Sequence, residues 1–194
     1  MEMLLNVLIV IVTVIGMEVF ACLTHRYIMH GPLGWAWHKS HHEETEGPFE
    51  KNDLYAVVFA VISGLVFIFG FVGIWPLRQV GIGLVVYGVL YFIVHDGLVH
   101  RRWPFTYVAK SGYLKRLVQA HHMHHAVGSR DGCVSFGFLY APPIRALKEQ
   151  LRANAAASQR RKERRGPVKA VRARDRVQRP ALKDGADAAT GQSG

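Results

Sequence analysis

Residues 54–75 read LYAVVFAVISGLVFIFGFVGIW, a run of 22 residues without a charged side chain. An α-helix rises about 1.5 Å per residue, so this run is long enough to cross a hydrocarbon core about 30 Å thick. A buried β-strand needs only about 4 to 8 apolar residues. The run therefore predicts a membrane-spanning helix, and it places the chain among the all-α integral membrane proteins.

Other apolar segments extend this pattern on both sides. Residues 3–23 are apolar apart from Asn6 and Glu18, and residues 80–94 lead into a polar stretch that begins at His95. Residues 132–144 are also apolar, but this segment is short and contains two prolines, so an interfacial or re-entrant piece is favoured over a span. We therefore predict three to four transmembrane helices.

The basic residues fall on one side of the predicted membrane. A hairpin over residues 54–94, turning at residues 76–79, brings the ends of the first and third spans to the same face. That face receives the basic residues of the connecting segments and of the C-terminal region, whereas the opposite face has only Arg78. By the positive-inside rule, we expect the first face to be cytoplasmic. Ser111 is expected to cap an interfacial helix over residues 112–125.

The C-terminal region differs in composition from the rest of the chain. Residues 151–194 carry a net charge of +8 out of +10 for the whole chain. They have almost no apolar periodicity and cannot bury enough surface to offset the entropy of ordering. We therefore expect a membrane-embedded domain, residues 1–150, followed by a disordered basic cytoplasmic tail, residues 151–194.

The arginine-rich stretch 160–165 of the tail has several possible roles. Most such stretches are solvated topology anchors, but binding to anionic lipid or steering of an acidic protein partner are alternatives. Positive charge alone would also suit nucleic acid, yet no nucleic-acid-binding motif accompanies it. We expect no nucleic-acid partner.

The histidines form a repeated pattern. All eleven lie in three short windows, which contain the motifs HX4H, HX2HH, HX4H and HX2HH in chain order. The ten motif histidines are His25, His30, His38, His41, His42, His95, His100, His121, His124 and His125. His122 is the one histidine outside the spacing.

This spacing predicts a metal centre. Helix positions i, i+3 and i+4 share one face, so each HX2HH motif can point three imidazoles into one volume. Residues five apart lie about 140° apart on a regular helix, so each HX4H pair needs a bend, a helix end or two metals. Gly31-Pro32 and Gly97 allow such departures. Ten ligands are too many for one ion, which indicates two metals about 4 Å apart.

The residue types do not identify the metal, and they leave alternatives for the groups that support its ligands. Imidazole accepts zinc, copper, iron and nickel alike. Asp96 is a candidate to accept a hydrogen bond from a ligand ring, although pairing with Arg101 or Arg102 explains it equally well. His122 is a second candidate to support the ligands from outside.

A metal pair at the membrane face suits a lipophilic substrate. Attack on an unactivated C–H bond needs an oxidant made from O2 at a metal or similar cofactor. The chain has no dinucleotide-binding fingerprint and no CxxC motif, so a separate electron donor is expected. A metal transporter and a bis-histidine haem protein are the rival classes. A transporter should place its ligands near the midplane of the membrane, and a haem needs fewer histidines.

The four motifs and their surroundings resemble a known family. The strings HRYIMHGPLGWAWHKSHHEE, FEKNDLYAVVFA, HDGLVHRRWPF and HHMHHA are similar to those of bacterial β-carotene hydroxylases, within the fatty-acid hydroxylase and sterol desaturase superfamily. The resemblance covers about residues 1–150. It implies a non-haem di-iron monooxygenase of the bacterial cytoplasmic membrane, in which the ten motif histidines hold two iron ions.

The resemblance also implies the reaction and its partners. The enzymes of this family use O2 and reduced ferredoxin, supplied by an NAD(P)H-dependent reductase, to hydroxylate C3 of the β-ionone rings, converting β-carotene through β-cryptoxanthin to zeaxanthin. A ketolase, a lipid hydroxylase or a desaturase with similar motifs stays open. Since β-carotene has no polar handle, its ring must be held by shape. The aromatic candidates are Tyr91, Phe92, Phe105 and Phe136.

Overall fold

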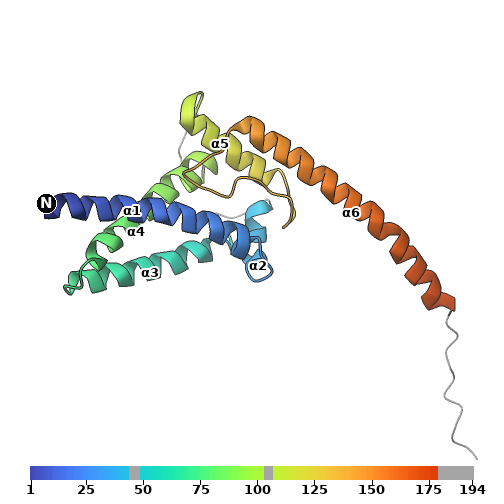
Figure 1. The fold of residues 1–194 in the computed structure, drawn as a ribbon, viewed down its shortest axis with the longest axis horizontal. Coiled ribbons are helices and arrows are strands. Elements are labelled where there is room, and N and C mark those ends of the chain that lie inside the picture. Colours follow the sequence, from blue (N-terminus) through green and yellow to red (C-terminus); the bar gives the residue numbers. More distant parts are fainter. Residues whose placement is uncertain (44–48, 103–106, 179–194) are drawn as a thin grey trace, which may run out of the picture. The chain divides into compact units, whose positions relative to one another are not determined.

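The protein is described by a computed structural model that covers residues 1–43, 49–102 and 107–178 (Figure 1). Every regular element within these ranges is a helix. In chain order the elements are α1 (Glu2–Leu23), η1 (Thr24–Met29), α2 (Trp35–His38), η2 (Lys39–His42), α3 (Asp53–Phe71), α4 (Leu77–Tyr91), η3 (Phe92–Val99), α5 (Gly112–His125) and α6 (Ile144–Gln178).

Three helical segments are long and apolar enough to cross a membrane. They are α1 with η1 (Glu2–Met29), α3 (Asp53–Phe71) and α4 with η3 (Leu77–Val99). The three predicted spans are thereby confirmed. Residues 132–143 are not helical, so this stretch does not supply a fourth span.

Helix α4 packs against both α1 and α3 (Figure 1). Two glycines make this close approach possible. A Cβ atom on Gly83 would lie 2.6 Å from Cβ of Thr13 in α1, and one on Gly81 would lie 2.6 Å from Cα of Phe67 in α3. Small residues of this kind let membrane helices pack backbone against backbone. The histidine-bearing ends η1 and η3 are thus held on neighbouring helices.

Helix α5 occupies the predicted range, and Ser111 stands at its N-cap position without a capping hydrogen bond from its side chain. The buried residues of α5 are Leu117, Ala120, His121 and His124. Tyr113 and Leu114, in the first turn, are exposed. The buried stripe follows i, i+3, i+4 and i+7 from Leu117 and therefore does not include the first turn.

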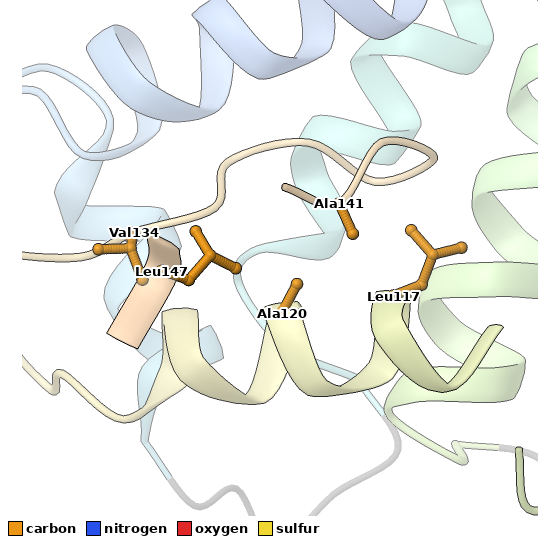
Figure 2. Packing of buried hydrophobic residues seen from close by; sticks show 5 residues of the cluster. All are labelled: Leu117, Ala120, Val134, Ala141 and Leu147. Atoms are coloured by element: carbon orange, nitrogen blue, oxygen red, sulfur yellow. The ribbon is translucent and has the colours of Figure 1, made fainter. Parts of the chain in front are cut away.

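A small apolar cluster ties α5 to the loop after it and to the start of α6. Figure 2 shows its five members, Leu117, Ala120, Val134, Ala141 and Leu147, converging from these three segments. All five are at most 5% exposed. The cluster fixes residues 132–143, hereafter the cap loop, against α5.

Helix α6 extends further along the C-terminal region than the composition of that region predicts. Disorder is predicted from residue 151, whereas α6 continues to Gln178. Alanine, arginine, glutamine and lysine are strong helix formers, so a segment without an apolar face can still be helical. The chain divides into two compact units, Met1–Ala155 and Ala156–Gly194. Residues 179–194 lie outside the described residues.

Candidate metal centre

The ten motif histidines form two groups of five. Within each group, Nε2 atoms of neighbouring rings lie 2.9 to 3.3 Å apart. Group 1 consists of His25, His30, His38, His42 and His124. Group 2 consists of His41, His95, His100, His121 and His125. Among the described residues, each of these short contacts joins two members of the same group.

The two kinds of motif are distributed differently between the groups. Each HX4H pair belongs to one group, whereas each HX2HH motif is divided between the two. The groups touch each other, because the ring centroids of His42 and His125 are 4.6 Å apart. The arrangement fits two metal ions side by side, with both HX2HH motifs linking them.

The HX4H pairs are brought together by π-helical turns. The N–H of His30 donates to the carbonyl of His25 over 3.0 Å, and the N–H of His100 donates to that of His95 over 2.9 Å. A π-helix bonds residue i to residue i+5, which places residues five apart on one face. The distortion required by the spacing is therefore a π-turn in η1 and another in η3.

In most of the motif histidines, the ring nitrogen that points away from the group, Nδ1, donates a hydrogen bond to an oxygen. In group 1, every Nδ1 donates to a neutral oxygen at 2.8 to 3.1 Å. The acceptors are the carbonyls of Phe136 for His25, Arg130 for His30, Val127 for His42 and Val134 for His124, and Oδ1 of Asn52 for His38. Four of the five acceptors are thus backbone carbonyls within residues 127–136, the segment that follows α5.

In group 2, two rings are supported by carboxylates. Nδ1 of His41 donates to Glu50 over 2.9 Å, and Nδ1 of His95 donates to Asp96 over 2.7 Å. Arg102 forms a bidentate ion pair with Asp53 at 2.7 Å and lies 3.8 Å from Asp96. Burial raises the pKa of the Glu50 carboxyl, and the charge of Arg102 opposes that shift.

These contacts determine which nitrogen faces inward with a lone pair. An oxygen that can only accept requires the proton on Nδ1, so Nε2 of a neutral ring is bare. His25 and His38, for example, face each other through two bare Nε2 atoms at 3.0 Å. Lone pairs this close repel each other unless a cation lies between them. The donor set therefore fits a metal in each group.

The protonation behaviour of the rings agrees with this interpretation. Burial, together with the charges of neighbouring histidines, lowers the pKa of His42 to about 4 and those of His38 and His125 to about 3. Burial also holds the pKa values of His121 and His124 well below their usual range. Neutral imidazole is the form that binds metal.

Asp96 and His122, the two predicted supporting residues, differ in position. Asp96 accepts from a ligand ring and also lies near Arg102, so both interpretations of it apply. His122 is exposed, and within the described residues it makes no hydrogen bond to a ligand.

The aromatic candidates also differ. Tyr91 stacks on His95 with ring centroids 4.6 Å apart. Phe136 contacts His25, His30 and His124 of group 1. Phe92 is 39% exposed, and Phe105 lies outside the described residues.

Sequence reasoning did not assign several residues of the centre. Glu50 and Asn52 lie in a polar stretch directly before α3, a signal that a search for imidazole partners could have used. Cys133 is buried, and its Sγ lies within 4.8 Å of ligand nitrogens of His30, His42 and His124. Burial raises the pKa of this thiol to about 11, so it is protonated when no metal is bound.

A family model described as fatty acid hydroxylase matches residues 10–141, which include both histidine groups. The chain belongs to the fatty acid hydroxylase family. It is accordingly a hydroxylating oxidoreductase.

The chain is similar to a β-carotene hydroxylase from Pantoea ananas, with 64% identity over 147 residues, 76% of this chain and 83% of the relative. It is 58% identical to a β-carotene hydroxylase from Pseudescherichia vulneris, over 77% of this chain and 85% of the relative. A chloroplastic β-carotene 3-hydroxylase from Haematococcus lacustris is 40% identical, over 71% of this chain and 44% of the relative. No solved structure matches the chain.

Proposed function

We propose that this protein hydroxylates β-carotene at C3 of its β-ionone rings, giving β-cryptoxanthin and then zeaxanthin. The observation that carries the proposal is the pair of histidine groups at the ends of helices that can cross a membrane. Similarity to β-carotene hydroxylases selects the substrate from among those of the family.

Groups 1 and 2 would hold two iron ions. When bound, this iron pair supplies oxidation of a C–H bond by O2. Each turnover inserts one oxygen atom into the C–H bond and reduces the other to water, which consumes two electrons and two protons. We propose that reduced ferredoxin, regenerated by an NAD(P)H-dependent reductase, delivers the electrons.

The side chains around the metals have separate tasks in this proposal. The acceptors of the Nδ1 hydrogen bonds would keep the histidine rings in one tautomer and orientation, with Nε2 free to bind iron. Burial of His38, His121 and His124 keeps water away from the ligand nitrogens. Asp96 would orient His95, whereas the exposed His122 is given no task.

The substrate would arrive from the bilayer, because β-carotene is almost entirely hydrocarbon. Its end ring would be held by shape among Tyr91, Phe92, Phe105 and Phe136. The stacking of Tyr91 on His95 supports a position for Tyr91 next to the reacting carbon. The protein would lie in the bacterial cytoplasmic membrane, with the metal centre and the tail facing the cytoplasm, as the distribution of basic residues favours.

The test uses a bacterial host that accumulates β-carotene. We compare the intact protein with His124→Ala, which removes a fully buried group 1 ligand, and with His122→Ala, which removes an exposed histidine two residues away. The intact protein and His122→Ala should yield mono- and dihydroxylated products, and His124→Ala should yield none. Unchanged β-carotene with intact protein in the membrane and a competent donor would overturn the proposal. Keto or desaturated products would indicate the related activities instead.

A further inference from the structure

Glu18 anchors the cap loop to α1. Its Oε1 accepts hydrogen bonds from the backbone N–H groups of Phe138, Leu139 and Tyr140, each at 2.9 Å. Its Oε2 accepts a hydrogen bond from the hydroxyl of Tyr87 in α4 at 3.0 Å. One carboxylate therefore joins two spans and a loop that lies about 120 residues further along the chain.

This contact answers two needs at membrane depth. Non-helical backbone in a membrane must find internal partners for its N–H groups. A carboxylate within a span must likewise be surrounded by donors. The contact is also tight, because a Cβ atom on Gly137 would lie 2.7 Å from Oε1 of Glu18 and 2.8 Å from the carbonyl of Tyr140. Glycine is needed there for the loop to reach Glu18.

The anchored loop places the ring of Phe138 against both histidine groups. The ring is 8% exposed and stacks on His25 of group 1, with centroids 5.2 Å apart and planes at 6°. It also meets the edge of His95 in group 2 at 5.3 Å and the ring of Tyr91 at 4.8 Å. The ring of Phe138 thus contacts histidines of both groups, and it lies across the two proposed metal positions.

The neighbouring Phe136 packs differently from Phe138. Phe136, only two residues earlier, contacts His25, His30 and His124, which all belong to group 1. Its ring also lies 5.6 Å from the guanidinium of Arg26. Phe136 therefore packs against one group, whereas Phe138 lies across both.

The position of Phe138 relative to the spans suggests what it contacts. Glu18 precedes His25 by seven residues, which is about 10 Å along the helix. A segment bound to Glu18 and touching Tyr91 therefore lies between the membrane-embedded part of α1 and α4 and the histidines. A hydrocarbon ring that reaches the metals from the bilayer between these helices meets Phe138.

We propose that Phe138 is the specificity-determining wall of the hydrocarbon site, and that Glu18 is the positioning residue that holds it there. Phe138 limits how far the ring of the substrate advances and so decides which carbon faces the metals. This inference rests on the proposed carotene hydroxylation, and it adds a residue to the aromatic candidates of that site.

The first experiment compares Phe138→Leu with Tyr140→Leu, which changes an exposed aromatic residue of the same loop, in a host that makes β-carotene. Metal per chain is measured on the purified proteins, and the position of each introduced oxygen is determined by mass spectrometry and NMR. Phe138→Leu should keep its metal and raise the share of products oxidised away from C3 about tenfold, the size of effect expected from one altered apolar contact. Tyr140→Leu should leave the position of oxidation unchanged, because the side chain of Tyr140 is exposed and only its backbone N–H bonds to Glu18.

The second experiment tests the anchor. Glu18→Ala removes the acceptor for three N–H groups, whereas Glu18→Gln keeps an amide oxygen in its place. Glu18→Ala should produce the same change in product position as Phe138→Leu. Glu18→Gln should oxidise C3 as the intact protein does. If Glu18→Ala does not accumulate in the membrane, Gly137→Ala displaces the same loop while keeping the carboxylate, and it should give the same products.

The outcomes separate this inference from the proposed function. No carotene oxidation by the intact protein would remove the proposed function itself. Oxidation at C3 by the intact protein, with the same product positions from Phe138→Leu, would overturn the inference alone. Loss of metal from Phe138→Leu would also overturn it, because Phe138 would then support the histidines rather than the substrate.

Discussion

Nδ1 of His41 donates a hydrogen bond to a carboxylate oxygen of Glu50 at 2.9 Å, and no ring of group 1 has a charged partner of this kind within the described residues. Asp96 provides a second carboxylate in group 2, behind His95. A carboxylate makes an imidazole ligand more basic and binds its ring more firmly than a carbonyl does. We therefore expect group 2 to hold its metal more tightly than group 1.

Replacing Glu50 with glutamine tests this difference. Glu50→Gln keeps an acceptor for His41 but removes its charge, and the metal affinity of group 2 should fall about 10- to 100-fold. The measurement is a titration of the metal-loaded protein with a chelator, followed by elemental analysis. The intact protein should release its metals in two steps, and Glu50→Gln should bring the second step close to the first.

Asn52→Asp is the reciprocal change in group 1. It supplies His38 with a carboxylate in place of the amide oxygen that His38 now contacts at 2.8 Å. The first step of the titration, in which group 1 releases its metal, should then require a higher chelator concentration. Identical titration curves for the intact protein and both variants would show that the charge behind the ligands does not separate the two sites.

Acid should destabilise the metal-free protein. The pKa values of His42, His38 and His125 lie at about 4, 3 and 3, below the usual value near 6.5, because these rings are buried among other histidines. Below about pH 6.5 the unfolded chain binds protons that the folded chain does not. The stability contributed by these neutral rings is therefore fully present above pH 6.5 and is lost as the pH falls towards 4 and then 3.

The measurement is the unfolding temperature of the metal-free protein in detergent between pH 8 and pH 4. It should stay level above pH 6.5 and fall steeply below it, and added metal should move the decline to lower pH. His122→Ala is the control, since this exposed ring should leave the curve unchanged. A flat curve over the whole range would contradict the pKa assignments.

Much of the site was predictable because its signals are local. Apolar length identified the three spans, and histidine spacing identified the rings that the structure brings together. The spacing of His25 and His30 also required a distortion, although it did not specify a π-turn. A bend, a helix end and a π-turn all satisfy the same sequence.

The remaining features depend on groups that have no residue signature. The carbonyls of Phe136 and Val134 support His25 and His124, but any residue type offers a backbone carbonyl. Glu18 was visible as a polar residue in an apolar run, yet its partners in the cap loop are about 120 residues away. Only the fold brings them into contact.

The core beneath the cap loop should be needed for the metal centre. Leu147 is 2% exposed and packs in the cluster that contains Val134, whose carbonyl accepts from His124. Leu147→Ala should destabilise the protein by about 2 to 5 kcal/mol and weaken metal binding by group 1. Thermal unfolding and metal analysis check this, with the exposed neighbour Lys148→Ala as the control. If Leu147→Ala and Lys148→Ala have the same unfolding temperature and the same metal content, the apolar cluster is not needed for the metal centre.

The basic tail provides the last prediction, which concerns the proposed electron donor. Truncation after Ala155 keeps Asn154, whose side chain donates to the carbonyl of Gly132 at 3.0 Å. The truncation removes eleven basic and four acidic residues. If the tail steers an acidic ferredoxin, the kcat/KM for the donor should fall about tenfold at low salt and converge with that of the intact chain at high salt.

A charge variant of the full-length chain completes this test. Replacing Arg160, Arg161 and Arg164 by glutamine lowers the charge but keeps residues of high helix propensity. This variant should show part of the same salt-dependent loss, because steering depends on charge rather than on the presence of the segment. Equal rates for all three proteins at both salt concentrations would leave the tail as a solvated topology anchor. A loss that does not change with salt would instead indicate that the tail contributes through a structural contact.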